Sequence, residues 1–422
     1  MKRFQLDALD ITLEKDGAQS FSKVSYPIRY GRFSEVRTPE HIFQFNRNGE
    51  IKYVQGRNNR WPHPSEWFKR TLSNDWIYYS TGGYKGVFSL FGEYYLPCLP
   101  YPSNTVISTY AFEQSVLDDA LAAWSSLVKK IKRYPKGAIP EEVFVFFTRL
   151  IENDPAALKQ MAAKLHSAIR GHVSVLPPDA RHVDYNVIPM MIADGCLYNC
   201  GFCRVKSGRS FSPRTEDDID DQIQKLKKII GPELLNYNAI FLGQHDSLNA
   251  EPALIEFAAQ KAYEAFDFKK SFIKGTYLFL FGSVGSFLCA PDVLFMALDK
   301  LPFYTYINLG LESTDAETLA VLKKPVDSEA VHEAFIKMHE TNRRYENIEV
   351  TANFVIGDYL PDTHETALSR LLGNGIDRTY SKGAVYISPL EKNKNNRDML
   401  NRFLKIKNHS RIPVFIYLIQ RL

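Results

Sequence analysis

Three cysteines in one short segment could together bind a metal centre. The segment reads Cys196-Leu-Tyr-Asn-Cys200-Gly-Phe-Cys203, with three residues between the first two cysteines and two between the last two. At this spacing one loop can wrap around a single small metal centre, and both zinc and iron–sulfur clusters are held by cysteine thiolates. Three thiolates leave one position of a four-iron cluster open, where a substrate or cofactor can bind an iron directly.

The other two cysteines, Cys98 and Cys289, are isolated in the sequence. An odd, clustered set is not a disulfide framework, and it favours metal ligation in a reducing compartment. Structural zinc is the alternative, and it would need a fourth ligand such as His245 or Cys289.

From residue 185 onward, apolar strand-like segments alternate with helical segments. Thr215-Glu-Asp-Asp218, for example, is a capping signal that begins a helix. The pattern predicts a parallel α/β sheet, curved or barrel-like, whose functional loops follow the carboxyl ends of the strands. The expected strands are 185–193, 238–242, 277–281, 304–311, 348–356 and 384–388, and the expected helices are 215–230, 251–266, 291–298, 315–324, 328–341 and 362–372.

The regions on either side of this segment have a different character. Residues before it are β-rich and then helical, and the stretch Val175-Leu-Pro-Pro-Asp179 has the composition of a linker. The final segment has eight basic residues against two acids and ends in an apolar strand-like run. We therefore expect an N-terminal α+β domain at 1–180, an α/β core at 181–390 and a basic C-terminal extension at 391–422. Within the first domain, helices are expected at 112–134 and 140–170. Asp154-Pro155 is a helix start that divides the second of these helices in two.

The pattern Cys-x-x-x-Cys-x-aromatic-Cys after the first of six β units resembles the signature of the radical S-adenosylmethionine (radical SAM) superfamily. The resemblance covers residues 185–390, about half of the chain. It implies a partial (β/α)6 barrel in which Cys196, Cys200 and Cys203 hold a [4Fe–4S] cluster. It also implies that S-adenosylmethionine (SAM) binds the open iron and is cleaved by one electron. The resulting 5′-deoxyadenosyl radical then takes a hydrogen atom from the substrate.

The same resemblance implies contacts to SAM from the first half of the core. Phe202 matches the aromatic position beside the cluster and the adenine. The second strand ends in Phe241-Leu-Gly-Gln-His-Asp246, where the family usually has glycine-glycine-acid. Gly243 and Gln244 are expected to contact the methionyl amino group through their carbonyls, with Asp246 beside them. His245 is a polar cavity residue or, as an alternative, a substrate contact.

Later strands provide the remaining expected contacts. Glu312 lies in Leu309-Gly-Leu-Glu-Ser313, which resembles a stretch whose acid contacts the cofactor. Lys324 is expected near the cofactor carboxylate, and Asn353 and Val355 are expected against the ribose and the adenine. A surface salt bridge would explain Glu312 without a cofactor, and complementing the helix dipole would explain Lys324.

The composition limits the class of protein. Of 422 residues, 45% are hydrophobic and 24% charged, which is typical of a globular protein and not of a disordered or coiled-coil chain. The net charge of +4 is not that of a strongly basic nucleic-acid binder. Neither a signal peptide nor a membrane span is expected, so we predict a cytoplasmic protein.

The substrate is the least determined part of the prediction. A second cysteine cluster is lacking, which argues against sulfur insertion, and the N-terminal region lacks the alternation of a cobalamin domain. We expect an organic small-molecule substrate and a one-electron donor such as flavodoxin or ferredoxin. An RNA- or peptide-modifying enzyme is one alternative, and a non-catalytic iron–sulfur or zinc protein is another.

Overall fold

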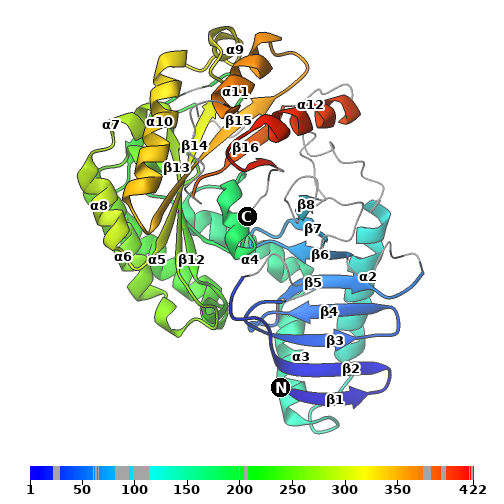
Figure 1. Cartoon of the computed structure of the whole chain (residues 1–422). Helices are drawn as coiled ribbons and strands as arrows, with labels where there is room; N and C mark the ends of the chain where they lie inside the picture. The colour runs from blue at the N-terminus through cyan, green and yellow to red at the C-terminus, as the bar shows by residue number, and fades with distance from the viewer. Residues whose placement is uncertain are drawn as a thin grey trace.

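The computed structural model describes residues 1–21, 29–59, 61, 64, 66–80, 95–97, 114–198, 200–203, 208–373, 382–390, 396–417, 419 and 422. Two large sheets organise these residues, and a small two-stranded sheet follows the first strand of the parallel one (Figure 1). One large sheet is antiparallel and is built from the N-terminal part of the chain, and the other is parallel and is built from the rest.

The larger unit is a seven-stranded parallel sheet. Its strand order is β17-β16-β15-β14-β13-β12-β9, so each strand lies beside the one that precedes it in this part of the chain. The six expected strands are all present, and a strand from the C-terminal segment adds a seventh. The strands are β9 (Ile188–Met190), β12 (Ala239–Leu242), β13 (Tyr277–Ser283), β14 (Tyr304–Glu312), β15 (Ile348–Ile356), β16 (Val385–Pro389) and β17 (Val414–Ile416).

Helices connect these strands and cover the outer face of the sheet (Figure 1). Thr215 begins the first of them as expected, because its side chain accepts a hydrogen bond from the Asp218 amide. Strand β13 runs to Ser283, whose side chain directly caps the next helix. The helices are α5 (Glu216–Ile230), α6 (Pro252–Ala265), α7 (Val284–Cys289), α8 (Asp292–Lys300), α9 (Ala316–Val321), α10 (Ser328–Arg344), α11 (Thr363–Gly373) and α12 (Asn396–His409).

The N-terminal unit is an antiparallel sheet in which β1 to β8 lie in chain order. Helices α2 (Gln114–Ile131), α3 (Glu141–Glu152) and α4 (Pro155–Ile169) follow it, and Asp154 caps α4 as predicted. The strands are β1 (Lys2–Leu6), β2 (Leu9–Asp16), β3 (Arg32–Arg37), β4 (His41–Phe45), β5 (Ile51–Gly56), β6 (Glu66–Arg70), β7 (Trp76–Ser80) and β8 (Tyr95–Pro97).

Two hydrophobic cores stabilise the molecule. One lies between the antiparallel sheet and helices α2 and α3, and it contains Trp61 and Trp76. The other fills the parallel sheet and its helices, but it also includes Trp67 and Leu165 from the N-terminal unit. Because the second core crosses the expected boundary at 180/181, a cut there would expose apolar surface on both sides.

The stretch expected to be a linker is instead buried under the parallel sheet. The chain from Leu176 continues into the 3-10 helix η2 (Pro178–Val183), and Asp179 is only 1% exposed. The Asp179 carboxylate accepts hydrogen bonds from Thr351 of β15 (2.5 Å) and Tyr386 of β16 (2.7 Å), while the His182 ring stacks on Tyr306 of β14. This segment therefore closes one end of the inner face of the sheet.

The C-terminal segment belongs to the same layer. Strand β17 pairs with β16, and α12 packs against α11. Most of its basic residues are in the described part, and Arg402 forms ion pairs with Asp358 and Glu365.

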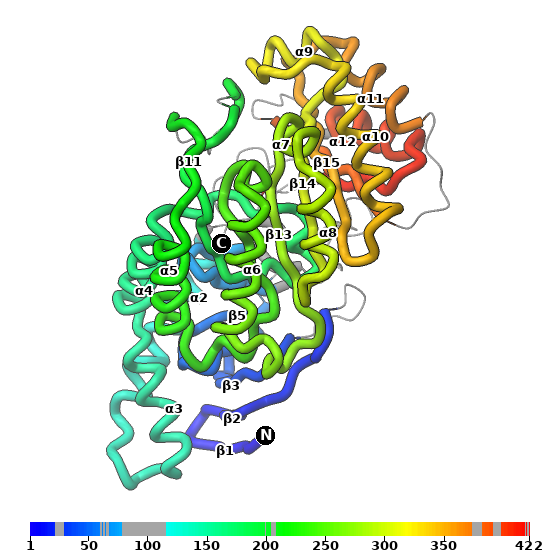
Figure 2. The backbone as a smooth tube through the Cα atoms, turned by 90° about the vertical axis from the view of Figure 1, so that its left-hand side faces the viewer, coloured from blue at the N-terminus to red at the C-terminus, as the bar shows by residue number. Residues whose placement is uncertain are grey.

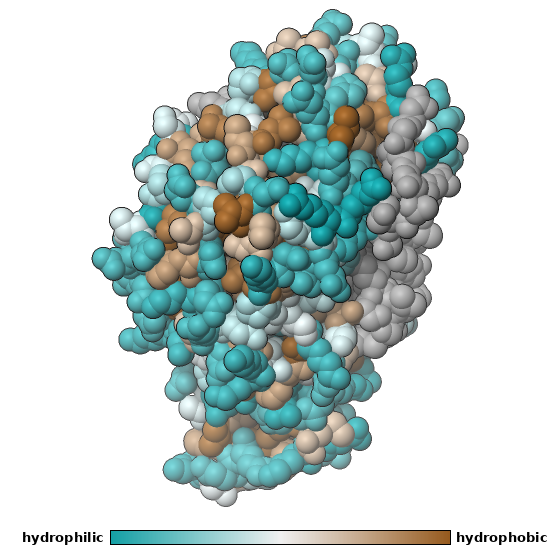
Figure 3. All heavy atoms as spheres, turned by 60° about the vertical axis from the view of Figure 1, so that its left-hand side comes forward, coloured by the Kyte–Doolittle hydropathy of each residue, from teal (hydrophilic) through white to brown (hydrophobic). Residues whose placement is uncertain are grey.

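The visible surface in Figure 3 is mostly polar, with separate apolar spots over the helices. Single exposed apolar side chains such as Val293 and Ile336 are usual on globular proteins. Within the described residues, no helix is long and apolar enough to cross a membrane.

Candidate active site at the carboxyl ends of the parallel strands

The cysteine loop begins in a two-stranded hairpin directly after β9. Its strands, β10 (Ala193–Asp194) and β11 (Ser212–Pro213), pair in antiparallel fashion, and Cys196 makes a further bridge to Ser210. Gly195 lies between them with a φ of +76°, and a Cβ there would come within 2.0 Å of the Ser210 carbonyl oxygen. Only glycine fits this position, so the backbone entering the loop is closely constrained.

Arg214 fastens this hairpin to the N-terminal unit. Its guanidinium donates two hydrogen bonds to the Asp194 carboxylate, at 2.7 and 3.0 Å, and a third to the carbonyl of Ile169 in α4 at 2.8 Å. The hydrogen bonds from Arg214 hold the pKa of Asp194 below its ordinary value. Figure 2 shows β11 and α9 toward the end of the molecule away from β1 and β2. The position of the cysteine loop thus depends on a contact with the preceding domain.

The three thiols of the cysteine loop are close enough to influence one another electrostatically. Cys200 is buried and Cys196 and Cys203 are half-buried. Burial raises the pKa of Cys200 to about 11, an effect that Lys324 opposes and Glu312 reinforces. Burial also raises the pKa of Cys196, which is close enough to Asp246 and Cys203 for both to add to the increase. The raised pKa values of Cys196 and Cys200 favour their protonated forms at neutral pH, so metal binding at these two thiols must displace protons.

The donor set fits an iron–sulfur cluster better than a single zinc ion. Across the described ranges, no three histidine, cysteine or acidic side chains lie close enough together to share one metal ion. Cys289, a proposed fourth zinc ligand, is exposed at the end of α7. In an iron–sulfur cluster, by contrast, each thiolate binds a different iron. Three cysteines spread along one loop can provide this arrangement.

The far end of the cysteine loop rests on the turn after α9. The Gly201 amide donates a hydrogen bond to the Leu322 carbonyl at 3.0 Å. Phe202 packs in a small apolar cluster with Leu322 and Val355. The structure therefore brings two of the expected adenine contacts, Phe202 and Val355, into one apolar cluster.

Glu312 and Lys324 form the charged part of the site. The Lys324 Nζ lies 3.6 Å from a carboxylate oxygen of Glu312, and both side chains are largely buried. Burial raises the pKa of Glu312, and the neighbouring ammonium opposes this increase. Lys324 also lies 5.7 Å from the centre of the Tyr198 ring, within the cysteine loop. Glu312 therefore does form an ion pair, but the pair is largely buried and is not a surface salt bridge.

The backbone at Glu312 is strained. Its φ is +67°, a left-handed conformation that glycine adopts freely and other residues adopt at a cost of about 1–2 kcal/mol. The pairing of β14 with β15 is irregular between Gly310 and Glu312. Strain of this kind persists where the surroundings over-determine the conformation, and it concentrates at functional sites.

The turn after β12 places the second set of expected contacts. Gly243 has a φ of +89°, which suits glycine. Asp246 Oδ1 accepts hydrogen bonds from the Ser283 amide (2.9 Å) and the Ser286 hydroxyl (2.6 Å). Its Oδ2 is buried and, among the described residues, has no hydrogen-bond partner. Because an unpaired buried carboxylate oxygen is costly, this atom is suited to a cationic ligand group.

Gln244 and His245 are less directly tied to the cysteine loop. The Gln244 side-chain oxygen accepts a hydrogen bond from the Ser174 amide at 2.9 Å, so the side chain stabilises the chain before η2. Only the backbone of Gln244 therefore remains for the expected contact. His245 is half-buried, and burial lowers its pKa, which is consistent with a neutral cavity residue.

Asn353 belongs to a polar network that the sequence analysis missed. Asn308 of β14 and Asn353 of β15 exchange hydrogen bonds through their side-chain amides. Asn308 also donates to Thr351 at 2.8 Å, and Thr351 donates to the buried Asp179. The alternation of β14 and β15 could have indicated that these side chains share the inner face. The contact with Asp179, however, depends on the fold.

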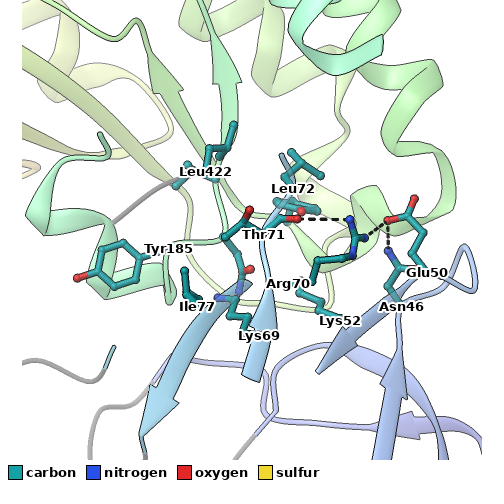
Figure 4. A pocket seen from close by; sticks show the side chains of 13 residues that line it. Asn46, Glu50, Lys52, Lys69, Arg70, Thr71, Leu72, Ile77, Tyr185 and Leu422 are labelled. Atoms are coloured by element: carbon teal, nitrogen blue, oxygen red, sulfur yellow. Dashed lines mark hydrogen bonds and ion pairs between the residues drawn. The ribbon is translucent and has the colours of Figure 1, made fainter. Parts of the chain in front are cut away.

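A second polar region lies at the opposite end of the parallel sheet, against the N-terminal unit. Figure 4 shows a cavity in this region, which is lined by Glu50, Lys69, Arg70 and Tyr185 among others. The cavity volume is about 30 Å³, room for little more than a water molecule. Its charges are paired, for example Arg70 with Glu50 at 2.7 Å. This region therefore has the character of an interface and not of a substrate site.

Comparisons with known proteins agree with the chemistry of the cysteine loop. The family model described as "Radical SAM superfamily" matches residues 190–371, which include the three cysteines and β10 to β15. No curated protein sequence matches the chain.

Solved structures resemble the chain at low identity. The cobalamin-dependent S-adenosylmethionine radical enzyme OxsB shares 16% identity, with 57% of this chain and 33% of that chain covered and a TM-score of 0.35. Streptococcus suis SuiB shares 12% identity over 85% of this chain and 72% of that chain, with a TM-score of 0.34. Methylornithine synthase shares 12% identity over 69% and 68%, with a TM-score of 0.33. The chain spans about a third of the length of OxsB, so the functional argument depends on the family match and the site.

Proposed function

Because residues 190–371 belong to the radical SAM superfamily, we propose that the chain cleaves SAM reductively and uses the resulting radical on an organic substrate. The cofactors of this superfamily are a [4Fe–4S] cluster and SAM. Together they supply, when bound, one-electron cleavage of the sulfonium to a 5′-deoxyadenosyl radical that abstracts hydrogen. The observation that carries the proposal is that Cys200, at the carboxyl ends of the strands, lies within electrostatic reach of the other two thiols and of the Glu312–Lys324 pair.

In this proposal Cys196, Cys200 and Cys203 are the metal ligands. The hairpin and the glycine at its base hold the start of the loop, and the Gly201–Leu322 hydrogen bond holds its end. Fixing the loop before metal binds lowers the entropy that the chain would otherwise lose on cluster assembly.

The charged groups around the loop match the two ends of a methionyl group. Asp246, with its unpaired oxygen, and Glu312 are suited to the cationic amino and sulfonium groups, and Lys324 is suited to the carboxylate. The carbonyls of Gly243 and Gln244 would add neutral acceptors beside the amino group.

The nucleoside end would lie over β15. Phe202 and Val355 form an apolar surface for the adenine, since they belong to one apolar cluster. Asn353 would meet the ribose hydroxyls, with its amide orientation set by Asn308. A purely structural iron–sulfur protein would not need this series of polar and apolar groups beyond the cluster.

The partners and the division into domains belong to the proposal as well. We expect a small-molecule substrate and a flavodoxin- or ferredoxin-type electron donor in the reducing cytoplasm. The proposed boundaries remain 1–180, 181–390 and 391–422. The RNA alternative finds little support, since Arg402 of the basic segment pairs with Asp358 and Glu365 within the chain.

Anaerobic reconstitution tests the proposed cofactors. The wild-type chain is incubated with iron and sulfide, and iron, sulfide and zinc are measured. We expect about four irons per chain and the broad visible absorbance of a cluster. The Cys289→Ala variant is the matched control, because that exposed cysteine lies outside the loop. One zinc and no iron after the same treatment would contradict the proposal.

A further inference from the structure

His364 lies in the first turn of α11 and touches the two central strands at their carboxyl ends. It is 1% exposed. One ring nitrogen, Nε2, lies 2.8 Å from the Val355 carbonyl oxygen of β15. The other, Nδ1, lies 2.8 Å from the Ser313 hydroxyl, the residue directly after β14. A single imidazole thus bridges the two strands just beyond the inner-face residues Glu312 and Asn353.

The two contacts determine how the protons are arranged. A carbonyl oxygen can only accept, so Nε2 carries the proton and donates to Val355. In the neutral ring Nδ1 is then an acceptor, and the Ser313 hydroxyl donates to it. The Ser313 oxygen in turn accepts a hydrogen bond from the Asp315 amide at 3.0 Å. Burial lowers the pKa of His364, in agreement with a neutral ring. Every polar atom in this chain of contacts therefore has a partner.

The same contacts enclose the strained residue of the site. Glu312 has its left-handed backbone between Leu311 and Ser313, and the Ser313 amide donates to the Leu311 carbonyl at 2.9 Å. The hydroxyl of Ser313 is held by His364 and Asp315. Because the residue after Glu312 cannot rotate without breaking these bonds, the strained conformation is kept in place.

The effect of His364 reaches other expected SAM contacts. Asp315, which bonds to Ser313, caps α9 by accepting from the Thr318 amide at 2.9 Å. The turn after α9 carries Lys324, the partner of Glu312. On the other side, His364 holds the backbone of Val355, which belongs to the small apolar cluster that Phe202 packs against.

We propose that His364 is a positioning residue for SAM, which holds Glu312 and Val355 in the geometry that binds the cofactor. The inference rests on the proposed function, since it assigns a role within that same site. It adds a residue that the cysteine motif and the strand motifs do not include. A merely structural histidine would change the stability of the chain without changing the affinity for SAM in the folded, cluster-loaded protein.

The test compares cluster-loaded variants for SAM binding. His364→Phe keeps a planar ring but removes both hydrogen bonds, and His364→Gln keeps one donor and one acceptor. His339→Phe is the matched control. It replaces a half-buried histidine on α10 whose ring meets the Phe335 ring edge-on, and none of its contacts within the described residues involves the site. Iron content, thermal midpoint and the dissociation constant for SAM by anaerobic equilibrium dialysis are measured for each protein. The change in the electron paramagnetic resonance spectrum of the reduced cluster on adding SAM gives a second readout.

We expect His364→Phe to retain the iron content of the wild type and to raise the dissociation constant for SAM about tenfold or more, the effect of two lost hydrogen bonds. His364→Gln should recover part of the affinity, and His339→Phe should bind SAM as the wild type does even where its thermal midpoint falls.

An unchanged SAM affinity in folded, iron-loaded His364→Phe would overturn the inference. A loss of iron in proportion to the loss of SAM would also overturn it, because the histidine would then support the cysteine loop instead. If His364→Phe does not fold, Ser313→Ala and His364→Gln decide the question by the same measurements. A wild-type chain that holds neither cluster nor SAM would refute the proposed function itself, a result distinct from both.

Discussion

The two ends of the parallel sheet both bury charged groups, but they treat them differently. At the amino end, the 3-10 helix η3 (Gly231–Asn236) meets the antiparallel sheet. There Asn236 exchanges hydrogen bonds with the Arg32 backbone, and the Glu233 carboxylate accepts from the Arg47 amide. At the carboxyl end, Asp246 keeps an unpaired buried oxygen and Glu312 has a strained backbone beside Lys324.

The difference indicates where each end obtains its stability. Charges at the amino end are neutralised within the protein, so this end joins the two units whether or not a ligand is bound. At the carboxyl end, the chain keeps desolvated acids, which a cationic cofactor would stabilise, and the thiols of Cys196 and Cys200, whose raised pKa a metal centre would lower. Variants at the two ends should therefore separate folding from cofactor binding.

Loss of a cluster ligand should have the largest effect. Cys200→Ala removes the most buried of the three thiols, and two cysteines cannot hold the cluster stably. Iron per chain after anaerobic reconstitution should fall by more than half, and the visible absorbance should be lost. Full iron content in Cys200→Ala, equal to that in Cys289→Ala, would disprove the ligand assignment.

Neutralising Glu312 should have the next largest effect. Glu312→Gln keeps the shape but removes the charge that faces the cationic groups of SAM. We expect the dissociation constant for SAM to rise by about 10–100-fold, or about 1.4–2.7 kcal/mol, with iron content unchanged.

Glu349→Gln is the matched control, since Glu349 also lies on the inner face of the sheet but near the amino end, bonded to the Gly383 amide and Tyr304. Equal SAM affinity in the two glutamine variants would remove the distinction between the two ends.

Releasing the cysteine loop from the N-terminal unit should have an intermediate effect. Arg214→Met breaks the bidentate contact with Asp194 and the hydrogen bond to α4. Because the loop then loses its anchor, we expect iron to be lost to a chelator several-fold faster than from the wild type. The decrease in the visible absorbance of the cluster measures this rate. Arg170→Met is the control, since it removes the exposed ion pair with Asp218 but leaves the hydrogen bonds between Arg214 and Asp194 in place. Identical rates in the two variants would show that the anchor does not position the loop.

A change at the amino end should leave the site intact. Asn236→Ala removes three hydrogen bonds, to the Arg32 amide and carbonyl and to Glu233. The free energy of unfolding should fall by about 1–3 kcal/mol. Iron content and SAM affinity of the folded protein should match the wild type, and a tenfold weaker SAM affinity would contradict the separation of the two ends.

Local patterns predicted much of the architecture. The expected strand 348–356 coincides with β15, and the caps at Thr215 and Asp154 lie where their side chains predicted. These features depend on residues close together in the chain, so spacing is informative. The same applies to Glu312 and Lys324, whose proximity follows from one strand and the short helix after it.

Features that depend on distant residues could not be predicted in this way. The two prolines before Asp179 indicated a linker, but the segment is buried because Thr351 and Tyr386 satisfy the carboxylate. His364 carries no motif, and its role appears only when α11 places it between the ends of β14 and β15. In both cases a polar group can be buried because it forms hydrogen bonds with residues that are distant in the sequence and come close only in the folded chain.

The central claim is that the thiols and charged groups at the carboxyl end support reductive cleavage of SAM. Its most direct test is to reduce the reconstituted wild-type chain with dithionite under anaerobic conditions, add SAM and measure 5′-deoxyadenosine by mass spectrometry. We predict 5′-deoxyadenosine from the wild type and from Cys289→Ala, and none from Cys200→Ala. A wild-type chain that binds the cluster and SAM but forms no more 5′-deoxyadenosine than Cys200→Ala would contradict the account.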